Sequence, residues 1–376
     1  MRILFLLGAK GHSPDDRNMN HFQRVYFLSR EAELTILGVK GADFSVSAAP
    51  GTEVIHAHGT GRGALILKAL VMALTGKARK YDIILSEPSI VCVGAFFLTI
   101  FSSAKWVVDV WDIPIRGMVD AGLPRRMYRK CMRFVLRQLF RKADLFILSI
   151  LPDYEWRKFD VTPTKSVRFK NAIWFSNKKT KKQNSDSTKV RKTFKILCMR
   201  SLHTFDMGLD TLCYSFLKLR KFIDELELVI IGDIEESVRL ELKRVLGVQG
   251  IRLTGFINNE QLNHEILNSD VVVIPFKNVP DLAQTYPIKV LEYLEMEKLI
   301  IASNIKGISQ LLKDRNNALL FEAGNVNDLF TKIYELYSDK NLQSKILHNI
   351  GQLDPEFNCV NKNSKIIESL INLMKR

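Results

Sequence analysis

The chain has 376 residues, 47% of them hydrophobic, and this length is typical of two domains. No uncharged apolar run reaches the roughly 18 residues of a membrane-spanning helix. Its formal net charge of +15 lies almost wholly in residues 125–142, with eight Lys/Arg and no acid, and residues 177–192, with seven Lys/Arg and one Asp. A charge this local indicates a surface patch and a linker, and it argues against a basic nucleic-acid-binding protein.

The first half of the chain alternates short apolar segments with amphipathic ones. The alternation predicts a parallel sheet with helices on both faces, which we assign to residues 1–176. Strands are expected at residues 2–7, 33–37, 53–57, 83–86, 106–110 and 145–148, and helices at 20–31, 62–75, 90–101, 125–141 and 152–159.

Residues 177–192 are rich in Lys, Ser and Asn without apolar periodicity, which predicts a flexible basic linker. A second α/β series follows in residues 193–358, and residues 359–376 are expected to form a C-terminal helix. In the second series, strands are expected at residues 195–199, 227–231, 251–254, 271–274, 299–302 and 318–321, and helices at 237–245, 259–268 and 288–295.

The five cysteines are scattered and form neither a CxxC pair nor a Cys/His metal spacing. This pattern predicts reduced thiols in a cytoplasmic protein. His56 and His58 share one side of a predicted strand, but no Cys or acid accompanies them. A loop that contacts a bound acceptor molecule or a cleft is therefore preferred over metal binding, and no metal site is expected.

The segment Tyr286-Pro-Ile-Lys-Val-Leu-Glu-Tyr293 precedes an apolar strand. Pro287 suits the first turn of a helix, where its missing N–H would have no partner anyway. The N–H groups at such a helix start attract phosphate, and Glu292, one turn later, can accept hydrogen bonds from sugar hydroxyls. The segment therefore suits a nucleotide-sugar, although a helix with a merely solvated Glu would look similar.

This motif, the basic loop and glycine after residues 195–199, and the strand of residues 271–274 that ends in Pro275 resemble the family-4-type glycosyltransferases of the GT-B fold. The resemblance spans most of the C-terminal half and is looser before it. It implies an α/β protein with two Rossmann-like domains facing each other across a cleft. The first would bind the acceptor, the second would bind a nucleotide diphosphate-sugar, and the C-terminal helix would return to the first.

The resemblance also implies which side chains hold the diphosphate. Arg200 directly follows a core strand, at the sheet edge where open α/β domains bind ligands. The family places a lysine before the glycine numbered 208 here, but this chain has Met207. We expect Lys289, in the first turn of the Glu292 helix, to supply the second cation for the leaving diphosphate.

The remaining donor contacts are also assigned by resemblance. Glu292 would bind the ribose hydroxyls, while Gln284 stands where the family often has a second glutamate, eight positions earlier. Two strand-exit turns are expected at the site, and by resemblance the second, Gly255-Phe256-Ile257, would frame the nucleobase, although both are also common structural turns. The other expected donor-binding residues are Gly232, Asp233, Gly255, Phe256, Ile257, Thr285, Tyr286 and Pro287.

In the first domain, the family often has a His-Asp pair at the end of the fifth strand. Here that position holds Trp111-Asp112, so the usual histidine is absent. We expect Asp112 to act in catalysis there, with Asp109 or a stacked Trp111 as alternatives.

The basic segment 125–142 predicts an amphipathic helix. Its acid-free basic face suits an anionic membrane surface, although a domain helix with a solvated basic back would have the same pattern. The expected apolar stripe is Tyr128, Met132, Val135 and Leu139, and the expected basic stripe is Arg126, Arg129, Arg133, Arg137 and Arg141.

These features predict a glycosyltransferase that moves a sugar from a nucleotide diphosphate-sugar to a lipid-linked acceptor in cell-surface polysaccharide biosynthesis. The resemblance implies retention at the sugar carbon and no metal or other cofactor. The protein would be cytoplasmic, bound peripherally to the inner face of the membrane. A GT-B-fold sugar-nucleotide epimerase is the alternative, and a basic nucleic-acid-binding protein is a weaker one.

Overall fold

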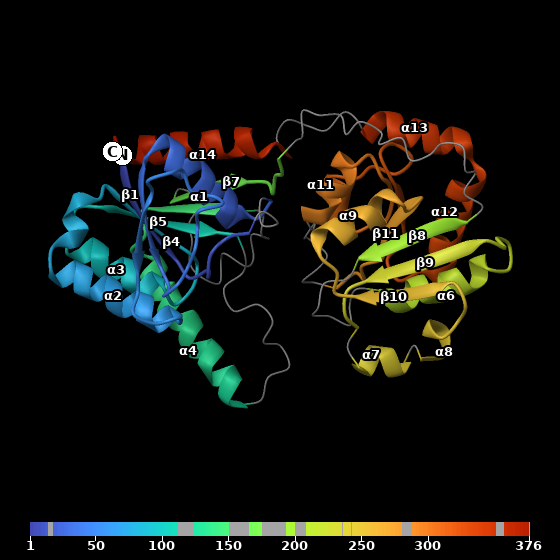
Figure 1. Cartoon of the computed structure of the whole chain (residues 1–376), viewed down its shortest axis with the longest axis horizontal. Coiled ribbons are helices and arrows are strands. Elements are labelled where there is room, and N and C mark those ends of the chain that lie inside the picture. Colours follow the sequence, from blue (N-terminus) through green and yellow to red (C-terminus); the bar gives the residue numbers. More distant parts are fainter. Residues whose placement is uncertain are drawn as a thin grey trace. The chain divides into compact units, whose positions relative to one another are not determined.

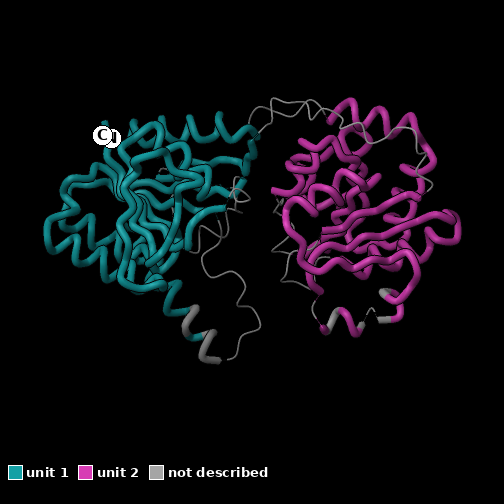
Figure 2. Tube along the Cα trace, viewed as in Figure 1, with its two compact units in different colours: residues 1–174, 355–376 teal, residues 175–354 magenta. Residues whose placement is uncertain are grey.

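The protein, seen in a computed structural model, forms two compact units, Met1–Trp174 with Pro355–Arg376, and Phe175–Asp354 (Figure 2). We call them unit 1 and unit 2. The chain therefore leaves unit 1 at residue 174 and re-enters it at residue 355. The structure describes residues 1–13, 18–111, 123–149, 165–174, 193–199, 208–234, 236–241, 243–279, 288–350 and 357–375.

Unit 1 contains a parallel sheet with the strand order β3-β2-β1-β4-β5-β6-β7 (Figure 1). The central strands are nearly continuous runs of buried Ile, Leu, Val and Phe, as expected for a sheet that is covered on both faces. The strands are β1 (Arg2–Leu7), β2 (Glu33–Gly38), β3 (Glu53–His56), β4 (Ile83–Ser86), β5 (Lys105–Val110), β6 (Leu145–Ser149) and β7 (Ser166–Phe169).

The helices of unit 1 form two layers. The path from β1 to β2 moves one way along the sheet and the paths from β3 through β6 move the other way. Because such crossovers are right-handed, α1 lies on one face and α2, α3 and α4 lie on the other. The bounds are α1 (Asn20–Glu31), α2 (Arg62–Leu74), α3 (Cys92–Ile100) and α4 (Leu123–Phe140).

The C-terminal helix, α14 (Cys359–Met374), packs against α1 through a buried polar network. The Lys362 ammonium donates to Asn20 Oδ1 and Gln23 Oε1, both at 2.7 Å. Beside it, the Arg24 Nε lies 2.5 Å from Asp109 Oδ2 of β5, and both side chains are fully buried. Burial, with the nearby Arg24 charge, lowers the pKa of Lys362 to about 7.

Unit 2 contains a second parallel sheet, with the order β10-β9-β8-β11-β12-β13. The strands are β8 (Phe194–Met199), β9 (Leu226–Ile231), β10 (Ile251–Gly255), β11 (Val271–Ile274), β12 (Leu299–Ser303) and β13 (Leu319–Phe321). The helices are α6 (Leu209–Leu219), α7 (Glu236–Glu241), α8 (Lys243–Leu246), α9 (Asn259–Leu267), α11 (Ile288–Glu295), α12 (Val326–Ser338) and α13 (Lys340–Ile350).

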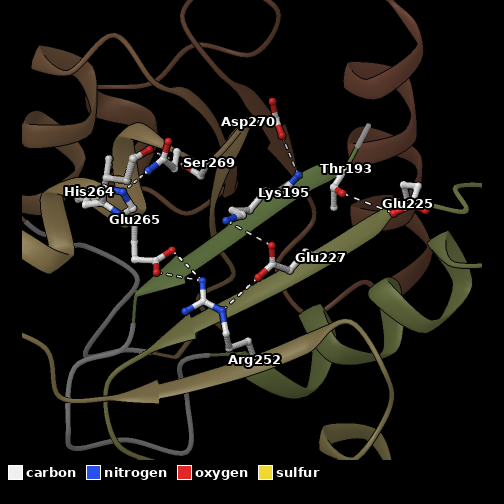
Figure 3. Close-up of polar contacts among 11 residues, drawn as sticks. Thr193, Lys195, Glu225, Glu227, Arg252, His264, Glu265, Ser269 and Asp270 are labelled. Carbon is white, nitrogen blue, oxygen red and sulfur yellow. Dashed lines mark hydrogen bonds and ion pairs between the residues drawn. The ribbon is translucent and has the colours of Figure 1, made fainter. Parts of the chain in front are cut away.

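Charged side chains tie the amino ends of the unit 2 strands together (Figure 3). Arg252 of β10 pairs with Glu227 of β9 at 3.1 Å and with Glu265 of α9 at 2.9 Å. Lys195 of β8 pairs with the same Glu227 at 3.3 Å, and its N–H donates to the Asp270 carboxylate. Since open α/β sheets bind ligands at the opposite, carboxyl edge, we interpret this network as structural.

The predicted fold class is confirmed, with differences in detail. The strand β7 was not predicted, because its four residues, Ser-Val-Arg-Phe, lack the long apolar run of a central strand; pairing with β6 orders them. The single helix predicted at residues 237–245 is described as α7 and α8, and the C-terminal helix spans Cys359–Met374. The helix expected at residues 152–159 lies outside the described residues.

Helix α4 packs with part of its predicted apolar stripe on the core of unit 1. Met132 and Leu139 are half-buried against that core, and Leu136 and Phe140 of the same helix are buried. The expected stripe is therefore a packing face of the domain. The side chains of Arg126, Tyr128 and Arg129 lie outside the described residues.

Candidate functional site

The carboxyl edge of the unit 2 sheet has a switch point between β8 and β11. The chain runs outward from β8 through β9 to β10, and then returns to add β11 on the other side of β8. Loops leaving adjacent strands in opposite directions open a crevice at such a point, which is where open α/β sheets bind ligands.

Gly208 brings the start of α6 to this point. Its φ of 67° lies in the left-handed region, and a side chain there would place its Cβ 1.7 Å from the carbonyl oxygen of Pro275. Only glycine fits both the conformation and the contact. The first turn of α6, with its unpaired N–H groups, is thus held against the end of β11.

The predicted cation Lys289 and hydroxyl acceptor Glu292 lie together on α11. The Lys289 Nζ is 2.7 Å from the Glu292 carboxylate, with side-chain exposures of 36% and 19%. Both therefore face the same side of the first turns of this helix. A diphosphate and a ribose could engage this pair jointly, with Lys289 toward phosphate and Glu292 toward hydroxyls.

The turn predicted to frame the nucleobase, after β10, meets the turn after β9 in the structure. Gly232, after β9, donates its N–H to the carbonyl of Gly255 at 2.9 Å. Beyond them, the ring of Phe256 is 65% exposed, while Ile257 is half-buried. An exposed aromatic face beside paired backbone turns could stack on a base. Asp233 is exposed, and its carboxylate accepts from the N–H of the next residue.

Several predicted residues lie outside the described part of the chain. These are Asp112, Arg200, Gln284, Thr285, Tyr286 and Pro287.

Two charged residues near the switch point were missed by the sequence reasoning. Lys277, three residues after β11, pairs with Asp210 in the first turn of α6 at 2.8 Å. The other carboxylate oxygen of Asp210 is buried and accepts no hydrogen bond among the described residues. A lysine so soon after the end of a core strand was the available signal for a further cation at this edge.

A polar cavity of about 370 Å³ adjoins the ends of β11, β12 and β13. Asn278, Asn304, Glu322 and Lys332 are among its lining residues. Lys332 pairs with Asp314 at 3.3 Å, and the Glu322 N–H donates to Asp328. Because none of the predicted donor-binding residues lines it, we assign this cavity no role.

In unit 1, polar side chains gather at the carboxyl ends of β1 and β5. The Ser47 hydroxyl donates to the Phe44 carbonyl, so its oxygen accepts from Nδ1 of buried His12 at 2.6 Å. The His12 Nε2 in turn lies 2.7 Å from His21 Nδ1. When both rings are neutral, His12 carries its hydrogen on Nδ1, and its Nε2 accepts a hydrogen bond from His21 Nδ1. The nitrogen of His21 without a hydrogen is then Nε2.

His21 also contacts the predicted strand-end tryptophan. Its ring centroid lies 5.8 Å from that of Trp111, in an edge-on arrangement. A histidine therefore occupies the neighbourhood of the strand-end histidine that the sequence lacks, supplied by α1 instead of β5. No local pattern signals this contact, since His12 and His21 lie in a loop and a helix far from β5 along the chain.

The other predicted histidines give no metal site. His56 is exposed, with Nδ1 3.3 Å from the Val39 carbonyl, and His58 is exposed. In the described ranges, no cluster of three or more His, Cys, Asp or Glu side chains could hold a metal ion.

Residues 193–339 match the family described as glycosyl transferases group 1. The matched residues lie within unit 2 and make up less than half of the chain. Among curated proteins, the chain is 23% identical over 131 residues to an α-D-kanosaminyltransferase of Streptomyces kanamyceticus. It is 30% identical over 98 residues to an uncharacterized glycosyltransferase of Methanocaldococcus jannaschii. These matches cover 34% and 25% of this chain, and only 32% and 28% of the two relatives.

Solved structures resemble the whole chain. HepE of Anabaena in complex with UDP has a TM-score of 0.71 at 16% identity, over 99% of this chain and 100% of that one. Sucrose-phosphate synthase of Thermosynechococcus elongatus has a TM-score of 0.66 at 12% identity, over 99% and 100%. At these identities the likeness shows the fold alone, and it confirms the predicted GT-B architecture. None of the helices in the described ranges is long and apolar enough to cross a bilayer.

Proposed function

We propose that the chain transfers a sugar from a nucleotide diphosphate-sugar to an acceptor hydroxyl. The observation that carries this is the Lys289–Glu292 pair on α11, within the residues that match the group 1 glycosyltransferase family. HepE is described in complex with UDP and with UDP-glucose, which makes UDP-sugars the first donors to test.

In the proposed reaction, negative charge grows on the diphosphate as the glycosidic bond breaks. Lys289, Arg200 and the N–H groups at the start of α6 would stabilise that charge, and Glu292 would hold the ribose. No metal or other cofactor is part of the proposal. On unit 1, Nε2 of His21 or the Asp112 carboxylate expected from the sequence would accept the proton of the attacking hydroxyl. Retention follows from the family resemblance.

We further propose a lipid-linked acceptor in cell-surface polysaccharide biosynthesis, used by a cytoplasmic protein held on the inner face of the membrane. The acid-free helix α4 supports this, because its described exposed side chains include Lys130, Arg133 and Arg137. Each such cation near an anionic surface contributes about 1 kcal/mol of binding.

The test is transfer itself. Purified protein is incubated with UDP-glucose and then with other nucleotide sugars, with and without a lipid-linked saccharide, and nucleoside diphosphate release and the sugar product are measured. Acceptor-dependent release with the sugar bond configuration of the donor supports the proposal. Failure of every donor to bind or turn over would refute it.

A sugar-nucleotide epimerase remains the second candidate. A protein of Listeria monocytogenes assigned as a UDP-N-acetylglucosamine 2-epimerase shares the fold, with a TM-score of 0.56 at 13% identity over 99% of this chain and 96% of that one. An epimerase would convert donor alone into an isomeric sugar nucleotide. The same incubations without acceptor therefore separate the two activities.

A further inference from the structure

The helical layer of α2, α3 and α4 contains no Asp or Glu anywhere in its three helices. On the opposite face of the sheet, α1 and α14 carry Glu31 and Glu368. Surface helices usually mix both signs of charge. The absence of carboxylates from three helices that share one face matches a partner that is itself negatively charged.

The outer side of α2 is apolar and exposed. Leu67, Val71 and Leu74 are 63%, 47% and 65% exposed, respectively. Their spacing of four and three residues puts them on one stripe of the helix, opposite the buried Leu65 and Ala69. Isolated exposed leucines are ordinary, but a continuous stripe of them marks an interaction surface.

Further exposed apolar side chains lie on α3, which packs against α2, and on α4, which packs against α3 (Figure 1). At the end of α3, Ile100 is 55% and Phe101 is 41% exposed. On α4, Met127 and Phe134 are 62% and 64% exposed, two helical turns apart. These two side chains lie on the outward side of α4, opposite the buried Leu136, and exposed cations accompany them.

We propose that the outer face of α2, α3 and α4 docks on an anionic lipid bilayer. The apolar side chains Leu67, Val71, Leu74 and Phe134 enter the interface between headgroups and acyl chains, and the cations of α4 contact lipid phosphates. The proposal deepens the membrane partner of the proposed function and rests on it for the acceptor. The proposed function uses only the cations of α4 for membrane contact, and the present proposal adds the exposed apolar side chains of the three helices.

The neighbouring charges favour lipid over a second copy of this chain. At the strand ends beside this layer, Glu53 pairs with Lys80 at 3.4 Å and Asp82 pairs with Arg2 at 3.3 Å. A two-fold dimer through the same face would set the cations of α4 against an identical acid-free surface. Repulsion between the two sets of cations would oppose the gain from apolar burial. An anionic bilayer offers phosphates to the cations and acyl chains to the apolar side chains.

The experiment measures co-sedimentation with vesicles of phosphatidylglycerol and phosphatidylcholine. The variant is Leu67→Gln, Val71→Gln, Leu74→Gln, and the matched control replaces three equally exposed apolar side chains elsewhere: Leu240→Gln, Leu267→Gln, Val360→Gln. We expect the α2 variant to lose at least about tenfold in partition coefficient, because three apolar side chains no longer leave water, and the control to match the wild type.

Two further readouts make the experiment specific. In 1 M salt the screening length falls to about 3 Å, so electrostatic binding is lost and a residual bound fraction reports apolar insertion. Cys131 on α4 is exposed, whereas the other four cysteines are buried, so an environment-sensitive thiol dye placed there should brighten on vesicles.

Equal partitioning of the α2 variant and the wild type would overturn the proposal. So would complete release of the wild type in 1 M salt, which would leave only electrostatic contact. A wild-type dimer that becomes monomeric in the α2 variant, without vesicle binding, would show instead that the face joins two copies. Transfer to a soluble acceptor is measured in parallel, because loss of vesicle binding with intact transfer refutes this inference alone.

Discussion

The buried Lys362 gives a prediction about stability and pH. Burial and Arg24 lower its pKa from 10.5 to about 7, against the opposing influence of Asp109. Between these two values the unfolded chain binds a proton that the folded unit 1 does not, so stability should rise with pH across this window. Below about pH 7 both states are protonated and the contribution is constant. The expected slope is about 1.4 kcal/mol per pH unit.

The variant Lys362→Met should remove this slope. It will also lose hydrogen bonds to Asn20 and Gln23, so the diagnostic is the change with pH and not the absolute stability. All four tryptophans lie in residues 1–174, so urea unfolding followed by their fluorescence reports unit 1. The control is Lys365→Met, an exposed lysine of the same helix. If Lys362→Met keeps the wild-type slope from pH 7.5 to 9.5, the lysine is not neutralised on folding and the reasoning is wrong.

Four further predictions concern unit 2 and the proposed reaction. Glu292→Ala should weaken nucleotide diphosphate binding by about 2–3 kcal/mol in calorimetry, while the control Glu260→Ala, at an exposed position, should bind like the wild type. If Glu292→Ala binds the nucleotide as tightly as the wild type, Glu292 is not part of the donor site. Arg200→Ala should lower kcat more than it raises KM, and a change in KM alone would mean uniform binding. Gly208→Ala should destabilise unit 2 by more than the roughly 1–2 kcal/mol cost of a left-handed alanine, as measured by urea titration with circular dichroism. The control Gly324→Ala, also at positive φ but in open space, should lose only that amount of stability. His21→Asn should abolish the acidic limb of the kcat/KM profile, and an unchanged limb would exclude His21 as the proton acceptor.

The strands, most of the helices and the donor-side motif could be predicted because their signals are local. The strand of residues 271–274 was placed without error, because four consecutive apolar β-branched residues between polar ones have one stable environment, a covered sheet. Lys289 and Glu292 could be assigned to one helix in advance, and residues three positions apart on a helix share a face. In contrast, β7 has no such local pattern, and only its pairing with β6 makes it a strand.

Contacts between distant parts of the chain were decided by tertiary structure alone. Lys362 reads in sequence like any surface lysine, and only the packing of α14 on α1 buries it beside residues 339 and 342 positions away. His21 reaches the ring of Trp111 because β1 and β5 both end at one sheet edge. Gly208 looks like a loop glycine until the fold brings Pro275 into contact with it. Periodicity fixes which face of an element is apolar, but which elements meet depends on the order of strands in the sheet, and that order is a property of the whole chain.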